Sequence, residues 1–238
     1  MGTVRSSRVF ALAPLALVLA LAMPLLASGC EPALTPAADY QFSGSHKACG
    51  NDAPALTDLG TNTFKTESVD GTSWKVLDFP LHHGLQLGST SQVVDNGTYT
   101  MVLLFRLDDP DGYRRLLDFN GSAFSGFFEV NEEVQLYPQT AGGTGINKTF
   151  VQVAVTRSSS GQFTAYIDGR KAFTYADGSS KYGVIANNVL RFFKNTKSDG
   201  VTGDGSGAVA RIRLFDKVLT GDQIKGLGEL PSSPCSTS

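Results

Sequence analysis

The chain lacks most of the short patterns that carry enzyme chemistry. Its 238 residues contain no Gly-x-Ser-x-Gly sequence and no phosphate-binding glycine loop, which excludes the usual hydrolase and nucleotide-binding hypotheses. Lys and Arg form no cluster and the formal net charge is -2, so nucleic acid, which requires a cationic surface, is not an expected partner. Histidine is scarce as well. His82 and His83 are neighbours that would point to opposite faces of an extended segment, and His46 has no obvious second ligand nearby, so zinc binding is not expected.

The first 29 residues have the composition of an export signal. Arg5 and Arg8 precede an apolar run over residues 9–27, which ends in small residues immediately before Cys30. A run of this length is also compatible with a membrane span, but small residues next to a cysteine fit a signal-peptidase site better. Without residues 1–29, Lys and Arg fall from 20 to 18 against 22 acidic residues, and the net charge becomes about -4.

The sequence Ala27-Ser28-Gly29-Cys30 resembles the bacterial lipoprotein signal, in which the cysteine becomes the first mature residue and carries the lipid. The resemblance implies an exported protein that is lipid-anchored at the cell envelope through Cys30. Leu26 lies one position earlier than the leucine of that signal, so ordinary secretion is the alternative. Residues 30–38 are expected to form the lipidated cysteine and a Pro/Ala tether, followed by one domain over residues 39–238.

Only three cysteines are present, and Cys49 and Cys235 remain once Cys30 is assigned to the lipid. An oxidising compartment favours a disulfide between them, and closing so long a loop stabilises by roughly 4–5 kcal/mol in the chain-entropy model. Two free thiols are the alternative. Because the two cysteines lie near the two ends of the domain, the disulfide also predicts that these ends lie close together.

Short stretches rich in Val, Ile, Phe, Tyr and Thr recur between clusters of Gly, Asn, Asp and Ser, which is typical of antiparallel sheets. Strands are predicted at 64–69, 73–79, 84–88, 98–107, 114–119, 126–130, 134–137, 149–157, 162–167, 171–175, 189–194 and 208–216. Asp168-Gly169 predicts a two-residue hairpin turn, and Asn131-Glu132 a second one. One helix is predicted over 221–227 with Thr220 as its N-cap. These elements indicate an all-β jelly-roll sandwich with a short C-terminal helix.

The segment from Val209 to Ile224 resembles the last strand and short helix of laminin-G-like jelly-roll domains, which belong to the concanavalin A-like lectin/glucanase superfamily. Weaker similarity at residues 113–119, 127–137, 166–169 and 190–194 extends the resemblance to about residues 40–227. It implies two curved antiparallel sheets that bind carbohydrate or protein, sometimes with calcium. A minority of the superfamily hydrolyses glycans, so the function has to be argued from the site residues.

Glu129-Val-Asn131-Glu-Glu133 approaches the Glu-x-Asp-x-Glu strand motif of the superfamily's glucanases. In one extended strand, Glu129 and Glu133 would share a face and could act as a nucleophile and an acid. The middle position is Asn131 instead of Asp, and a turn at Asn131-Glu132 would destroy the shared face. The turn is the favoured interpretation, and no catalytic residue is assigned.

The loop from Asn195 to Gly207 is acidic and glycine-rich, and Asp199 and Asp204 are its candidate ligands for calcium. Two carboxylates are few for a tight site, and the alternative is an ordinary surface loop. Four aromatic residues, Trp74, Tyr113, Tyr137 and Tyr182, have rings suited to stacking on a sugar; packing in the core or in a hairpin is the alternative for each.

Together these features predict a non-catalytic protein of the bacterial cell envelope, which presents a jelly roll to a glycan or to an envelope or extracellular protein. The alternatives are a weak or degenerate glycan hydrolase and a purely structural envelope component. No cofactor is predicted apart from calcium.

Overall fold

The computed structural model describes residues 1–2, 34–122, 125–195 and 203–235. Residues 3–29 of the predicted signal peptide and Cys30 therefore lie outside the described residues. Residues Leu34–Ser238 form one compact unit that contains both sheets. Within the described ranges, no helix is long and apolar enough to cross a membrane.

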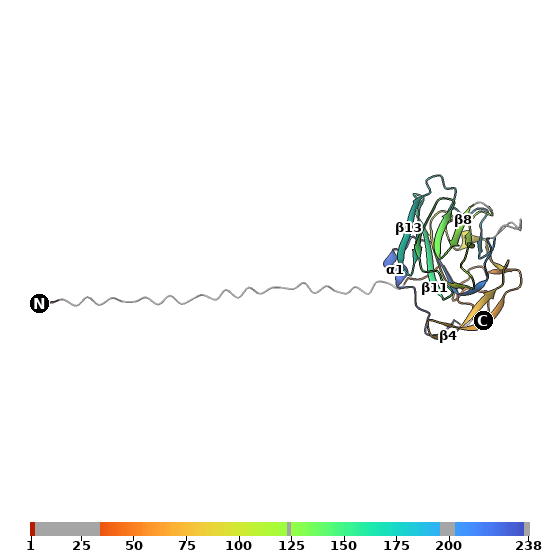
Figure 1. Cartoon of the computed structure of the whole chain (residues 1–238), viewed down its shortest axis with the longest axis horizontal. Helices are drawn as coiled ribbons and strands as arrows, with labels where there is room; N and C mark the ends of the chain where they lie inside the picture. Colours follow the sequence, from red (N-terminus) through yellow and green to blue (C-terminus); the bar gives the residue numbers. More distant parts are fainter. Residues whose placement is uncertain (3–33, 123–124, 196–202, 236–238) are drawn as a thin grey trace. The chain divides into compact units, whose positions relative to one another are not determined.

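The fold is a sandwich of two antiparallel sheets, as predicted (Figure 1). One sheet has eight strands. In spatial order its main path runs β13 (Arg170–Ala176), β12 (Gln162–Ile167), β11 (Val151–Arg157), β6 (Tyr99–Leu107), β15 (Gly207–Phe215), β4 (Thr72–Phe79) and β3 (Thr63–Val69), and β1 (Ala38–Tyr40) pairs with β15. The first strand thus begins at Ala38, one residue before the predicted start of the domain.

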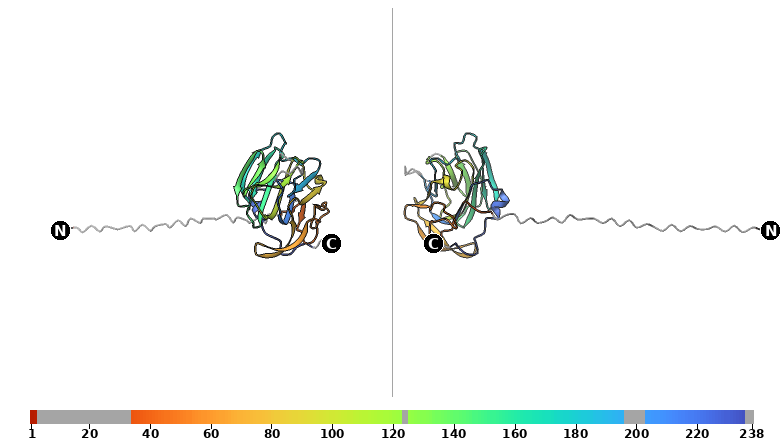
Figure 2. Two further views of the ribbon diagram at one scale, coloured as in Figure 1. Left: turned by 45° about the vertical axis from the view of Figure 1, so that its right-hand side comes forward. Right: turned by 180° about the vertical axis from the view of Figure 1, so that it is seen from behind.

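The second sheet has seven strands. Its spatial order is β10 (Thr140–Thr144), β9 (Glu133–Tyr137), β8 (Gly126–Val130), β7 (Tyr113–Asp118), β14 (Val189–Phe192), β5 (Gly84–Gly88) and β2 (Thr57–Leu59). Seen from two further sides, the strands of this sheet lie across from those of the eight-stranded sheet (Figure 2).

The hydrophobic core fills the space between the sheets because alternate residues of each strand point inward. Leu103 of β6 and Val153 of β11 are directly paired across the eight-stranded sheet, and both are fully buried. They belong to the same cluster as Phe127, Leu136 and Phe192 of the seven-stranded sheet. The outer face of each sheet points away from this core, and we therefore examined these two faces for a binding site.

The single α-helix in the described part of the chain is α1 (Gly221–Lys225). Its N-cap is Thr220, whose hydroxyl accepts a hydrogen bond from the Gln223 N–H, while the Gln223 side chain accepts one from the Thr220 N–H. This capping box satisfies two of the N–H groups that a helix start leaves unpaired. Ile224 is buried against the outer face of the eight-stranded sheet, in a cluster with Val102 and Ala154.

The predicted strands are present, with ends that differ from the prediction by no more than two residues. Three short strands, β1, β2 and β10, and the 3-10 turn η1 (Thr90–Gln92) had no counterpart in the prediction. The observed helix α1 ends at Lys225, two residues before the predicted C-terminal end at residue 227.

Cys49 and Cys235 form a disulfide with a Cα–Cα distance of 5.9 Å across a sequence separation of 186 residues. The backbone N–H of Cys235 also donates a hydrogen bond to Gln41 Oε1, at 2.9 Å. The C-terminal segment is thereby fastened beside β1, and the two ends of the domain lie close together as the cysteine pair predicted.

Candidate functional site

A row of mostly polar side chains crosses the outer face of the seven-stranded sheet, the face that points away from the core. Residues that are directly opposite on paired strands point to the same face, so the strand registers define this row. The outer row consists of Gln135, Phe128, Arg115, Asp118, Arg191, Gln86 and Thr57, in order from β9 to β2.

A β-bulge in β7 allows two charged residues of one strand to take part in the row. Arg115 is opposite Phe128 whereas Leu117 is opposite Phe127, so Leu116 is an extra residue in the strand. Leu116 and Leu117 both enter the core. Arg115 and Asp118 consequently both point outward, although regular alternation would place them on opposite faces.

Arg115 is fully buried on this outer face because the chain after β7 folds back over it. Its guanidinium donates hydrogen bonds to the carbonyl oxygens of Ser125 (2.9 Å) and Ser122 (3.1 Å), and it lies 4.4 Å from the centre of the Phe128 ring. Burial lowers the pKa of Arg115, and the nearby carboxylate of Asp118 offsets part of this effect, with Nη1 and Oδ1 3.6 Å apart. The buried cation thus holds the loop and the aromatic ring in place.

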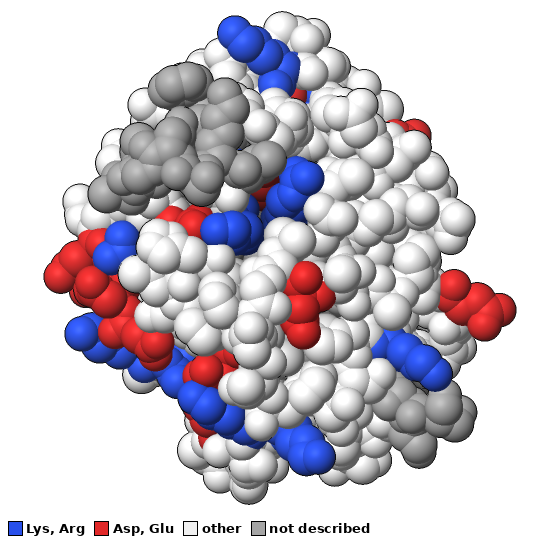
Figure 3. Space-filling model, turned by 90° about the vertical axis from the view of Figure 1, so that its right-hand side faces the viewer, with Lys and Arg blue, Asp and Glu red and all other residues white. Residues whose placement is uncertain are grey.

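Asp118 connects Arg115 to the next strand of the row. Its Oδ1 accepts hydrogen bonds from the N–H groups of Asn120 and Gly121, and its Oδ2 lies 3.7 Å from Nη1 of Arg191. Figure 3 views the molecule from the side on which β8 lies in Figure 1, and it shows basic and acidic side chains gathered in a hollow near the middle of this face. Arg115 and Asp118 are buried, so the polar side chains of the row that this face presents to solvent include Arg191 and the half-buried Gln135 and Gln86.

Three aromatic rings lie beside Arg115 at the β9 end of the row. Tyr113 and Tyr137 meet edge to face with ring centroids 5.7 Å apart, and Phe128 lies 6.0 Å from Tyr113 and 5.9 Å from Tyr137. These three rings are the aromatic cluster. Tyr113 is 40% exposed, which makes it one of the few large apolar residues of the described chain that face solvent.

Two of the four predicted sugar-stacking residues are therefore brought together, and the other two lie elsewhere. Trp74 of β4 is buried, at 6% exposure, in a small cluster on the outer face of the eight-stranded sheet. The ring of Tyr182 meets Tyr175 of β13 edge to face at 6.1 Å. Packing is thus the role that the structure shows for Trp74 and Tyr182.

The structure describes only one of the two candidate calcium ligands, because Asp199 lies outside the described residues. Asp204 is almost buried, and its Oδ2 pairs with Lys194 Nζ (3.0 Å) and His82 Nδ1 (3.1 Å). Its Oδ1 accepts a hydrogen bond from the Asn195 N–H. Among the described residues, no group of three or more His, Cys, Asp or Glu side chains is arranged to hold a metal ion.

The histidines have separate partners. His82 faces Asp204, whereas Nδ1 of His83 lies 2.9 Å from both the backbone nitrogen and the backbone oxygen of Thr61. His46 pairs with Asp58, with 3.0 Å between Nε2 and Oδ1.

The glucanase-like motif is interrupted by a hairpin turn, so the idea of a paired-carboxylate site there is wrong. Asn131 and Glu132 have φ angles of 51° and 72°, which are the positive values of a type I′ turn. Glu129 is directly opposite Val134, a core residue, whereas Glu133 is opposite Val130. Glu129 and Glu133 therefore point to opposite faces of the sheet and cannot act on one glycosidic bond.

Glu129 is instead a buried acid at the edge of the core. Its Oε1 accepts a hydrogen bond from the Glu132 N–H, at 2.6 Å, and its Oε2 has no partner in the described part of the chain. Burial raises the pKa of Glu129 to about 8, and the hydrogen bond from Glu132 and the charge of Arg114 oppose this shift.

The comparisons with known proteins agree with this architecture. The laminin G model described as the concanavalin A-like lectin/glucanases superfamily matches residues 85–225. The chain belongs to this superfamily. A comparison with curated protein sequences finds no match.

Solved structures of the same fold come from several kinds of protein. Domain 4 of AbnA, a GH43 extracellular arabinanase from Geobacillus stearothermophilus solved in complex with arabinotriose, has a TM-score of 0.65 at 14% identity; the match covers 82% of this chain and 98% of that one. The binding domain of botulinum neurotoxin serotype G has a TM-score of 0.55 at 9% identity, with coverage of 82% and 50%. A Trypanosoma rangeli sialidase in complex with the inhibitor DANA also scores 0.55, at 18% identity, with coverage of 77% and 32%. At these identities the similarity establishes the fold alone.

Proposed function

We propose that the protein is a non-catalytic receptor of the bacterial cell envelope that binds a glycan on the outer face of its seven-stranded sheet. The observation that carries the proposal is the aromatic cluster of Tyr113, Phe128 and Tyr137 beside the buried guanidinium of Arg115. Sugars combine C–H faces, which pack on aromatic rings, with hydroxyl groups, which need both donors and acceptors. The half-buried amide of Gln135, directly opposite Phe128 in the outer row, supplies both kinds of group next to the rings.

Two further facts support a binding role. Arg191, the partly exposed cation of the row, is held by the buried carboxylate of Asp118, so it can orient a ligand without a large rearrangement. The arabinanase domain that shares the fold was solved with arabinotriose, which supports a glycan as the ligand class. A catalytic role has no comparable support, because Glu129 and Glu133 point to opposite faces of their sheet.

The proposal includes export and lipidation at Cys30. The small residues before Cys30 and the disulfide between Cys49 and Cys235 support it, since disulfides form in oxidising compartments outside the cytosol. Incorporation of labelled palmitate into the full chain, and its loss in the Cys30→Ser variant, is the expected result. Secretion of an unlabelled protein would support ordinary export instead.

Binding is tested by screening the full chain against a broad glycan panel, first with calcium and then with a chelator. Tyr137→Ala and Tyr113→Ala are expected to weaken the strongest interaction at least tenfold, because each removes a ring of the cluster. Phe64→Ala is the matched control, since Phe64 is also a solvent-exposed aromatic residue but lies on β3 of the other sheet. An affinity that is unchanged in both tyrosine variants contradicts this site.

The same screen examines calcium and the alternative functions. A loss of binding with the chelator would support a calcium-dependent interaction near Asp199 and Asp204. No binding to any glycan under either condition would favour an envelope protein as the partner, or a structural role.

A further inference from the structure

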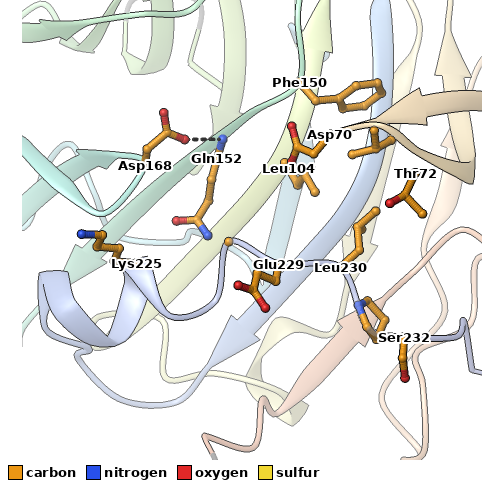
Figure 4. Close-up of a pocket in the computed structure, with 13 residues that line it drawn as sticks. Asp70, Thr72, Leu104, Phe150, Gln152, Asp168, Lys225, Glu229, Leu230 and Ser232 are labelled. Carbon is orange, nitrogen blue, oxygen red and sulfur yellow. Dashed lines mark hydrogen bonds between the residues drawn. The ribbon is translucent and has the colours of Figure 1, made fainter.

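A second recess lies on the other side of the sandwich, on the outer face of the eight-stranded sheet. It has a volume of about 800 Å³ and is lined by Leu104 of β6, Gln152 of β11 and the C-terminal segment 228–232 (Figure 4). Asp70, in the β3–β4 turn, and Asp168, in the β12–β13 turn, also line it, on opposite sides of Leu104 and Gln152 in the view of Figure 4. We call it the Gln152 pocket.

Gln152 is a buried polar group without a partner. The residue is 3% exposed, yet neither its Nε2 nor its Oε1 has a hydrogen-bond partner within the described ranges. Figure 4 shows its amide extending from β11 into the space between Lys225 and Glu229. Buried amides are almost always hydrogen-bonded, and an unpaired one is costly, so this amide is suited to a ligand that supplies both a donor and an acceptor.

The charges around the pocket disfavour an anionic ligand. Asp70, Asp168 and Glu229 line it, and Lys225 is the single basic residue among the described residues of the lining. Asp70 and Asp168 occupy equivalent positions, because each begins an Asp-Gly turn and has a positive φ, 48° and 49° respectively. Both hairpins therefore present a carboxylate, which accepts hydrogen bonds from hydroxyl groups but repels other anions.

The remaining lining is apolar and lies over paired strands. Phe150, Leu104 and Leu230 provide contacts for C–H groups. A peptide strand has no free ladder edge to extend here, because β6 and β11 are each hydrogen-bonded to neighbours on both sides. Among the described residues there is no cluster of metal ligands either.

We propose that the Gln152 pocket is a second binding site, and that its ligand is a neutral oligosaccharide. Hydroxyl groups are both donors and acceptors, so those of one oligosaccharide can pair with both ends of the Gln152 amide and also donate to Asp70 and Asp168. The C–H groups of the same oligosaccharide pack on Phe150 and Leu230. This site does not depend on the aromatic cluster, which lies on the outer face of the other sheet.

The wall of the pocket is built before a ligand binds. Arg211 Nη1 donates a hydrogen bond to the Glu229 carbonyl oxygen at 3.3 Å, and Arg213 donates one to the carbonyl oxygen of Leu227. Beyond the pocket, the disulfide at Cys235 fastens the same segment to Cys49. A fixed wall reduces the entropy that is lost on binding.

Trp74 is a natural reporter for this pocket. It is the only tryptophan in the chain, and it packs in the small cluster that includes Val69, Leu104 and Leu230, all of which also line the pocket. Titration of the full chain with neutral trisaccharides (arabinotriose, maltotriose and cellotriose) is expected to give a saturable change of its fluorescence. The anionic trisaccharide 3′-sialyllactose is expected to bind at least tenfold more weakly.

Gln152→Leu is the direct test, with the same substitution at Gln162, an exposed residue of β12, as the matched control. Gln152→Leu should weaken the trisaccharide affinity measured from Trp74 fluorescence at least tenfold, and Gln162→Leu should leave that affinity unchanged. The double variant Asp70→Asn/Asp168→Asn provides a second test, because Asn-Gly suits the same turns. It should fold normally and lose most of the discrimination against 3′-sialyllactose.

Three results would overturn the assignment: no saturable Trp74 response to any neutral trisaccharide, tighter binding of 3′-sialyllactose, or an undiminished response in Gln152→Leu. Failure of the proposed function would appear differently. In that case Tyr137→Ala would leave the panel interaction unchanged, whatever Trp74 reports.

Discussion

Arg157 and Asp177 form a buried ion pair, with 3.4 Å between Nη2 and Oδ2 and both side chains almost inaccessible to solvent. Arg157 also donates a hydrogen bond to the Gly97 carbonyl oxygen, at 2.6 Å. The carboxylate of Asp177 accepts hydrogen bonds from the N–H groups of Lys181 and Gly183. The pair thus fixes the loop that follows β13, in a region where the sequence predicted no regular element.

Asp177→Ala is expected to lower the free energy of unfolding by about 3–5 kcal/mol, because it leaves the Arg157 guanidinium buried without its countercharge. Urea denaturation followed by circular dichroism measures this loss. Asp216→Ala, which removes an exposed carboxylate, should stay within about 0.5 kcal/mol of the wild type. A loss below about 1 kcal/mol for Asp177→Ala would show that the pair contributes little.

Glu129→Gln is expected to stabilise the protein at high pH. Burial raises the folded-state pKa of Glu129 to about 8 from its ordinary value of 4.5, so between these values the folded state retains a proton that the unfolded state has released. The free energy of unfolding therefore falls as the pH rises from about 4.5 to about 8. The loss is at most about 5 kcal/mol, since each pKa unit corresponds to roughly 1.4 kcal/mol.

The measurement is the free energy of unfolding of both proteins at pH 4 and pH 9. The difference should be small at pH 4, where both states of the wild type are protonated, and should favour Glu129→Gln at pH 9. Glu133→Gln, at the opposite side of the turn, is the control. Equal stability of wild type and Glu129→Gln at pH 9 would mean that the buried carboxyl ionises without cost.

Removal of the disulfide by Cys49→Ser/Cys235→Ser is expected to cost about 2–5 kcal/mol of stability, because the unfolded chain regains the freedom of a very long loop. The variant should also alter the Trp74 emission, since Leu230 packs in the same cluster as Trp74 and precedes Cys235 by only a few residues. Denaturant unfolding with and without a reducing agent tests both effects. Reduction should destabilise the wild type and leave the double variant unaffected.

Thr220→Ala is expected to destabilise by about 0.5–2 kcal/mol through loss of the N-cap of α1. Thr220→Ser retains the hydroxyl and should recover most of this loss, which separates capping from packing. Thermal unfolding of the three proteins is the measurement. Equal stabilities of the alanine and serine variants would contradict the capping role.

Much of the fold follows from the alternation of apolar and polar residues along the chain. The bounds of β5, β8 and β12 are the predicted ones, because these strands lie between clear turn residues. In β5 and β12, alternate apolar residues such as Leu85 and Leu87 or Phe163 and Ala165 also enter the core. β10 shows the limit of this reasoning. Its sequence Thr-Ala-Gly-Gly-Thr has no apolar alternation, and it becomes a strand through its pairing with β9.

The candidate site is less predictable than the fold, because its residues do not follow the alternation of apolar and polar residues. Tyr113 and Tyr137 are selected by their chemistry. Arg115 is missed because the bulge at Leu116 interrupts the alternation of its strand, and Phe128 because its sequence does not distinguish it from its neighbour Phe127 in the core. Gln152 appears in sequence as a polar residue between the apolar Val151 and Val153. The sequence does not show that its side-chain amide is buried without a hydrogen-bond partner, because this depends on how the C-terminal segment packs near β11.

The outer faces of the two sheets point in opposite directions, since the core lies between them. A glycan on the aromatic cluster and another in the Gln152 pocket would therefore not compete for space. One domain could then join two polysaccharide strands, and its retention on an insoluble glycan would exceed what either contact provides alone, because the second contact forms at a high effective concentration. Such a domain would act as a cross-link in a polysaccharide layer.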